Sequence, residues 1–175
     1  MAANHFIVPT MPLGKVTAAR LGAGNTSNDR FTDVDAGKIV KLAATDRYDL
    51  AAAGDAIEGI VVAVESGTSN GYSVGGVVSE GKAFVTADGL QATAGTGTIA
   101  VGDYVVTGTV VARNTAMAGY PKVCKATVQI GDVPASLTAA GLQIKAALYA
   151  WRVVSLGQVG TGAVGTVIVI ERVAP

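Results

Sequence analysis

From residue 37 onward, short stretches of β-branched and other apolar residues alternate with Gly, Asp, Asn and Ser. Short apolar stretches separated by turn-forming residues are typical of an antiparallel β-sandwich or β-barrel. We therefore expect an all-β fold. The predicted strands are residues 38–43, 57–65, 72–79, 82–87, 104–112, 122–130, 147–156 and 164–173.

The turns between these strands have recognisable chemistry. Asn70-Gly71 and Asp88-Gly89 supply residues that tolerate positive φ, so both pairs predict hairpin turns. The last two strands flank a Gly-rich connection and are expected to form one more hairpin. In residues 137–146, apolar side chains recur at both helical and strand spacings, so one short helix and a strand both remain open.

Residues 1–35 differ from the rest of the chain. Pro9, Pro12 and the Gly/Asn/Ser-rich run at 22–28 interrupt any regular period. We predict an extended N-terminal arm over 1–35, followed by a single β domain over 36–175. The arm nevertheless carries apolar side chains that would be unfavourable in water, so we expect them to dock on a partner. These expected anchors are Phe6, Ile7, Val8, Met11 and Leu13.

The composition favours association with other proteins. Apolar residues make up 50% of the chain and charged residues only 15%, against about 25% charged in an ordinary soluble domain. Few charges and surplus apolar surface promote association, although Ala and Gly also raise the apolar count without adding adhesive patches. Thirteen basic residues balance thirteen acidic ones, so we expect no nucleic acid or anionic membrane as partner.

We expect no targeting segment. The first ten residues lack the cationic start and continuous apolar stretch of a signal peptide. No apolar run approaches the ~18 residues of a membrane-spanning helix. We expect the protein to be made in the cytoplasm and to remain there until it assembles.

The residues that usually carry catalysis or bind metals are sparse. The single histidine, His5, lies in the expected arm, where a general base could not be held in place. Cys124 alternates with apolar neighbours and is interpreted as a core thiol. Asp29, Asp33 and Asp35 form the densest acidic group, but their spacing fits no standard calcium loop, so we interpret them as a solvated junction. We expect no catalytic, cofactor-binding or metal-binding residues, and hence no enzyme.

Two glycine-rich motifs resemble nucleotide-binding sequences. Residues 76–83 come within one residue of a phosphate-binding loop, but Ala83 replaces the required Ser or Thr. Residues 160–165 match the dinucleotide-binding pattern letter for letter. Because both motifs lead into strand-like sequence rather than a helix, we reject both.

Residues 54–63 and residues 102–112 are weakly similar in sequence. Each segment begins with Gly-Asp and continues into a β-branched strand. The similarity is short, so we interpret it as reuse of a strand-starting turn rather than as a duplication.

Three segments resemble capsid decoration proteins, also called cement or head-stabilising proteins, of tailed bacteriophages. They are Gly-Lys-Ile-Val-Lys-Leu (37–42), Gly-Asp-Ala-Ile-Glu-Gly-Ile-Val-Val-Ala (54–63) and Gly-Asp-Tyr-Val-Val (102–106). The resemblance covers residues 37–113, with a weaker match at 164–172. It implies a β-sandwich or barrel of the β-tulip or jelly-roll kind.

The same resemblance implies a function and a location. It implies a structural virion protein on the capsid exterior that stabilises the shell by bridging neighbouring subunits. The implied partners are the major capsid protein and other copies of the chain, with a homotrimer favoured and a dimer as the alternative. The alternative function is a receptor- or glycan-binding β module of a phage fibre or bacterial surface layer. That function would require an exposed aromatic cluster, for which Tyr72, Tyr104 and Tyr120 are the candidates.

Overall fold

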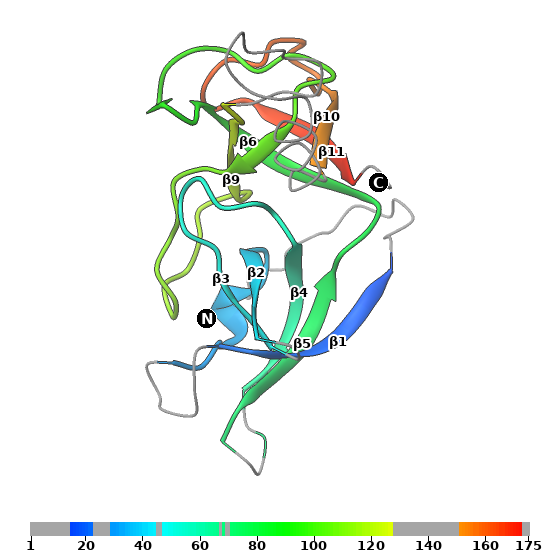
Figure 1. The fold of residues 1–175 in the computed structure, drawn as a ribbon, viewed down its shortest axis with the longest axis vertical. Helices are drawn as coiled ribbons and strands as arrows, with labels where there is room; N and C mark the ends of the chain where they lie inside the picture. Colours follow the sequence, from blue (N-terminus) through cyan, green and yellow to red (C-terminus); the bar gives the residue numbers. More distant parts are fainter. Residues whose placement is uncertain are drawn as a thin grey trace, which may run out of the picture.

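The computed structural model describes residues 15–22, 29–44, 47–66, 68, 71–127 and 151–172, and it confirms the all-β fold (Figure 1). One short 3₁₀ helix, η1 (Asp33–Asp35), lies between the first two strands of the described chain. The strands are β1 (Val16–Leu21), β2 (Ile39–Ala44), β3 (Arg47–Leu50), β4 (Gly59–Glu65), β5 (Ser73–Val78), β6 (Lys82–Leu90), β7 (Thr93–Ala94), β8 (Val105–Thr107), β9 (Lys122–Lys125), β10 (Trp151–Ser155) and β11 (Val167–Arg172).

The first five strands form a closed barrel, in the lower half of Figure 1, with the order β1-β3-β2-β4-β5. Pairing of β1 with β5 closes the barrel, although β2 pairs with β4 only through Ile39 and Val40. The interior is a small apolar core. Its fully buried members are Leu21, Phe31, Val40, Val61 and Val77.

Gly75 makes the tight closure of this barrel possible. Its strand, β5, pairs with both β1 and β4. A Cβ atom at Gly75 would lie 2.2 Å from the carbonyl oxygen of Ala63 and 2.6 Å from Cδ1 of Leu21. A side chain here would push the strands apart, which explains the glycine at this position of an otherwise β-branched strand.

The remaining strands form a second sheet, in the upper half of Figure 1, with the order β10-β11-β6-β9-β8 and β7 added to β6. Its outer strands meet through an antiparallel bridge between Tyr104 and Arg152. Two backbone hydrogen bonds reinforce this bridge, from Val153 to the Asp103 carbonyl at 2.9 Å and from Gly102 to the Val153 carbonyl at 2.8 Å. The second sheet therefore curls round until its two edges touch.

The barrel and the second sheet share one hydrophobic core. Four buried barrel-side residues, Ile39, Ala51, Ile57 and Ile60, belong to the same cluster as the buried residues of the second sheet. That cluster contains Val85, Ala87, Ile99, Val105, Val123, Trp151, Val153, Ile168 and Ile170. The two parts therefore pack as one unit.

Strand for strand, the second sheet repeats the topology of the barrel. In chain order, β1, β2, β3, β4 and β5 correspond to β6, β8, β9, β10 and β11, and the neighbours in each sheet match under this correspondence. Each part contains one parallel pair, β1 with β3 and β6 with β9, and its other neighbours are antiparallel.

The repeat extends to individual hydrogen bonds. In the barrel, Gly37 donates to the Val61 carbonyl at 2.6 Å, and Val61 donates to the Lys38 carbonyl at 3.0 Å. The bonds among Gly102, Val153 and Asp103 have the same arrangement. Val61 and Val153 are thus each held by two backbone hydrogen bonds. Immediately after each of them the strand register shifts, between 61 and 63 in β4 and between 153 and 155 in β10. The protein therefore contains two copies of one five-stranded unit.

The sequence similarity between Gly54-Asp55 and Gly102-Asp103 reflects the same kind of turn, as interpreted from the sequence. The Asp55 carboxylate accepts the amide three residues earlier at 2.8 Å, and the Asp103 carboxylate does the same at 2.7 Å. The structural repeat, however, aligns Gly102 with Gly37 rather than with Gly54. A duplication is thus present, but in an alignment different from that of the two Gly-Asp segments.

The expected arm boundary at residue 35 is wrong. β1 pairs along its whole length with β5, and Phe31 and Asp35 are fully buried. Residues 15–22 and 29–35 are therefore integral to the barrel. Their Ala-rich, weakly patterned sequence concealed this, because β1 becomes a strand through pairing on both sides rather than through its own propensity.

Other local expectations had mixed outcomes. The final hairpin is confirmed as β10 and β11. Asp88-Gly89 is not a hairpin tip: both residues lie inside β6, where the pairing with β9 is irregular. Only 105–107 of the expected 104–112 strand forms β8, and β1, β3 and β7 were not predicted. Residues 137–146 lie outside the described part of the chain.

Candidate assembly surface

The apolar anchors named from the sequence cannot be placed. Phe6, Ile7, Val8, Met11 and Leu13 all lie outside the described residues, as does His5. The described chain begins at Lys15 and enters β1 directly. Whether these anchors contact a partner remains a prediction.

A buried ion pair joins the barrel to the long loop 108–121 between β8 and β9. Lys38 and Asp35 are both almost completely buried, and their side chains lie 2.6 Å apart. Lys38 also donates to the carbonyls of Ala112, at 2.6 Å, and Thr115, at 2.8 Å. All three ammonium protons thus have acceptors, two of them on the loop, so the pair fastens the loop to the barrel.

The carboxylate of Asp35 is equally well satisfied. It accepts the backbone amides of Thr32, at 2.7 Å, and Asn114, at 2.9 Å, in addition to Lys38. A buried charge is tolerated when it is paired and fully hydrogen-bonded in this way. The expectation of a solvated acidic junction is therefore wrong for Asp35. The Thr-x-x-Asp spacing, which resembles a helix-start signal, could have indicated a structural role.

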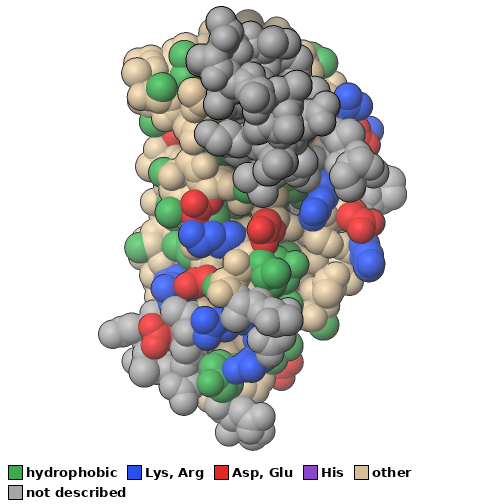
Figure 2. Space-filling model, in the orientation of Figure 1, with side chains coloured by type: hydrophobic (Ala, Val, Ile, Leu, Met, Phe, Trp, Pro, Cys, Tyr) green, Lys and Arg blue, Asp and Glu red, His purple; other side chains and the backbone are tan. Residues whose placement is uncertain are grey.

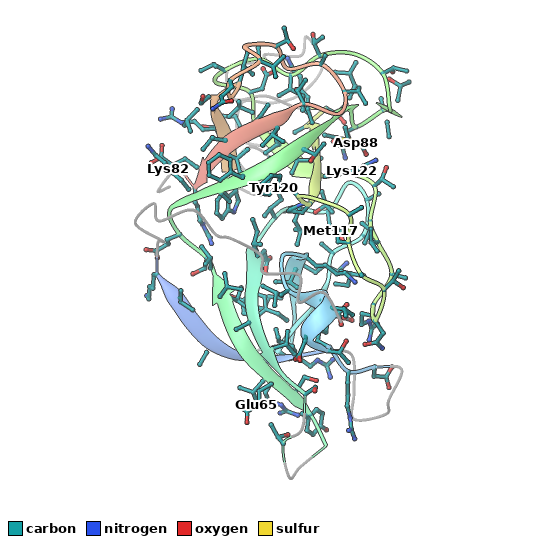
Figure 3. The ribbon with its side chains drawn as sticks, turned by 180° about the vertical axis from the view of Figure 1, so that it is seen from behind. Glu65, Lys82, Asp88, Met117, Tyr120 and Lys122 are labelled. Carbon is teal, nitrogen blue, oxygen red and sulfur yellow. The ribbon has the colours of Figure 1, made fainter. Side chains whose placement is uncertain are left out.

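A second buried carboxylate fixes the start of the same loop. Asp88 of β6 accepts the amide of Thr109 at 2.8 Å and its hydroxyl at 2.6 Å. The ammonium group of Lys122 lies 3.4 Å away, and Figure 3 shows the two side chains together. Burial opposes ionisation of Asp88, but these hydrogen bonds and the Lys122 charge outweigh it and lower its pKa. Asp88 is thus an ionised structural group.

Cys124 is a core thiol, as predicted. Its side chain is buried beside Val106 and Ala126. Burial, together with the nearby negative charge of Asp88, raises the pKa of Cys124 to about 11. A neutral, buried thiol at physiological pH is a poor nucleophile.

A small cavity lies between the barrel and the loop 108–121. Its volume is about 20 Å³, which is room for about one water molecule and far less than a substrate needs. The buried hydroxyl of Thr107, one of the lining residues, has no hydrogen-bond partner within the described chain. The lining also includes Lys38, Leu50, Val110, Met117 and Lys122, of which Met117 and Lys122 are labelled in Figure 3.

The described residues form no metal-ligand cluster of three or more His, Cys, Asp or Glu side chains. Their surface carries positive and negative side chains side by side, and the face in Figure 2 shows no field of one sign. Large apolar side chains are exposed on both the barrel and the second sheet. They are Val16, Val34, Leu42, Val101, Val159, Val164 and Val167.

The three tyrosines proposed as an aromatic cluster contact different groups. Tyr72 lies against the guanidinium group of Arg20, 3.9 Å from ring centre to Cζ. Tyr104 packs against the small core around Cys124. Tyr120 packs on Phe84, with ring centres 5.8 Å apart. None of these contacts joins one of the tyrosines to another.

Comparison with known proteins gave no match: no family model, curated protein or solved structure is similar to this chain. In the described residues, no helix is long and apolar enough to cross a membrane.

Proposed function

We propose that the protein is a structural virion protein that binds the outer surface of a tailed-phage capsid and stabilises it by bridging neighbouring capsid subunits. The observation that carries the proposal is the use of the buried charges. Asp35, Lys38 and Asp88 all bind the loop 108–121 through several hydrogen bonds. These groups stabilise the fold and its longest described loop, as expected of a protein whose task is to keep its shape.

The segments that resemble decoration proteins coincide with defined structural units. Residues 37–42 form a turn that is hydrogen-bonded to β4, together with the start of β2. Residues 102–106 form the equivalent turn and the start of β8. Residues 54–63 contain the turn that joins the barrel to the second sheet. The resemblance thus covers elements that specify the repeated unit and its junction.

The surface suits a protein partner. Exposed apolar side chains favour association at about 25 cal/mol per Å² buried, before the entropy of association is subtracted. A typical stable interface buries about 1,600 Å² in total. Because this chain has few charged side chains to desolvate, burying such an area of its surface costs little free energy. On the face in Figure 2, the described residues form no continuous basic track for nucleic acid.

The preferred partners are the major capsid protein and further copies of the chain, with a homotrimer favoured over a dimer. A rigid binder loses little conformational entropy when it docks. The shared core and the paired sheet edges supply that rigidity here. The alternative of a glycan-binding module gains no support from Tyr72, Tyr104 and Tyr120, because their contacts form no common platform.

Co-sedimentation with capsid shells tests the proposal. Shells assembled from the major capsid protein of the same genome are mixed with the purified chain and pelleted, and shell stability is followed by heating. We expect saturable binding, a higher temperature of shell disruption, and binding that persists in 0.5 M salt because exposed charges contribute little. A chain that stays in the supernatant and leaves shell stability unchanged contradicts the proposal.

A further inference from the structure

The internal repeat pairs two residues whose surroundings differ. Leu42 lies opposite Tyr48 in the β2–β3 ladder, and Thr107 lies opposite Val123 in the β8–β9 ladder. Tyr48 and Val123 are themselves equivalent, because they pair with equivalent positions of β1 and β6. Leu42 and Thr107 therefore hold the same place in the two copies of the unit.

At Thr107 the outer edge of the strand is occupied. Gly54 donates to the Thr107 carbonyl at 2.8 Å, and Thr107 donates to the Asp55 carbonyl at 2.9 Å. Both groups come from the turn after β3 of the barrel, which takes the positive φ that glycine allows. The turn covers the edge, and Thr107 is only 3% exposed. This contact is one of the joints between the barrel and the second sheet.

Among the described residues, no backbone group pairs with the equivalent edge at Leu42. The ladder between β2 and β4 includes only Ile39 and Val40 of β2, and the Leu42 side chain is 48% exposed. The Leu42 amide donates to the side-chain carboxylate of Glu58, not to backbone. A surface carboxylate is a replaceable partner, whereas an exposed apolar side chain on a strand edge favours pairing with another chain.

We propose that the β2 edge at Leu42 binds a turn from a second copy of this chain, in the way that the β8 edge at Thr107 binds the turn at 54–55. A second copy is the occupant because the equivalent edge is already covered by a unit of this same fold. Edge and turn are different surfaces, so the contact is heterologous and can close into a ring. The proposal rests on the self-association part of the proposed function but not on capsid contact.

Placing a charge on the edge tests the contact. Leu42→Lys puts a lysine, the side chain that most often protects natural sheet edges, at a half-exposed site. Val34→Lys is the matched control, since Val34 belongs to the same half of the molecule and is 44% exposed. Light scattering after size exclusion at micromolar to submillimolar concentration measures the mass. We expect wild type and Val34→Lys to form multiples of the 17.4 kDa chain, and Leu42→Lys to associate at least tenfold more weakly.

Two results overturn the proposal: a wild-type protein that is monomeric throughout, or a folded Leu42→Lys protein that associates like wild type. Hydrogen exchange of the wild type at low and high concentration provides a test without a variant. Peptides covering residues 40–44 should gain protection on association, and unchanged protection also overturns the proposal. Shell binding separates this inference from the proposed function. A monomeric wild type that binds shells rejects the edge contact alone, whereas an oligomer that loses mass in Leu42→Lys and ignores shells supports the contact and rejects the capsid role.

Discussion

Replacing Lys38 by Met should destabilise the protein severely. Met keeps most of the length and volume of the lysine side chain but supplies no charge and no donor. The substitution leaves Asp35 charged and fully buried, and removes the hydrogen bonds to the carbonyls of Ala112 and Thr115. Removing one partner of a buried ion pair costs about 3–5 kcal/mol. The two carbonyls belong to the same network, so their separate losses do not simply add.

We therefore expect a loss of about 4 kcal/mol, a large part of the roughly 5–15 kcal/mol that stabilises a typical domain. Urea unfolding at pH 7 measures it, with fluorescence of Trp151 as the signal, because this is the single tryptophan of the chain and it is fully buried. With a slope of about 2 kcal/mol per M, the midpoint should fall by about 2 M. Trp151 lies in the second sheet and Lys38 in the barrel, so a single shifted transition also shows that the two parts unfold together.

Two further variants show whether the lost charge pair is responsible. Lys82→Met removes an exposed lysine at the start of β6 and should change the free energy of unfolding by less than about 0.5 kcal/mol. Adding Asp35→Asn to Lys38→Met removes the uncompensated charge and should recover part of the loss. A midpoint shift below about 0.5 M for Lys38→Met would refute the conclusion that this ion pair holds the loop to the barrel.

Other predictions concern the thiol, the barrel closure and the first strand. Cys124 should resist thiol reagents at pH 8 until the protein unfolds. Because its pKa rises to about 11 in the folded state, its contribution to the free energy of unfolding should be complete below about pH 9 and decline between about pH 9 and 11. Urea titrations across this pH range would show the decline. Gly75→Ala should destabilise by about 3 kcal/mol, because its Cβ would lie 2.2 Å from a backbone oxygen. Gly76→Ala, whose Cβ would meet only side-chain atoms at 3.0 Å, should cost less in the same melting assay. Deleting residues 1–30 should abolish the cooperative melt, because it removes β1 from the closed barrel; a near-native circular dichroism spectrum and melt would contradict the assignment of β1 as integral.

The local pattern of the sequence was sufficient for most of the β structure. Stretches such as 59–65, 73–78 and 167–172 combine β-branched residues with flanking turn residues, and each is a strand. Propensity and turn chemistry are properties of neighbouring residues, so a sequence shows them directly. The same reasoning identified Cys124 as a core residue, and its side chain is buried.

The tertiary structure alone decided which polar or weakly patterned segments become part of the core. β1 and β3 have little strand propensity and form because partners lie on both sides. The buried role of Asp35 depends on a loop about eighty residues away, and a charged residue is ordinarily expected at the surface. The repeat was hidden for a related reason. The backbone hydrogen bonds that define it are available to almost every residue type, so equivalent positions such as Leu42 and Thr107 need not resemble each other.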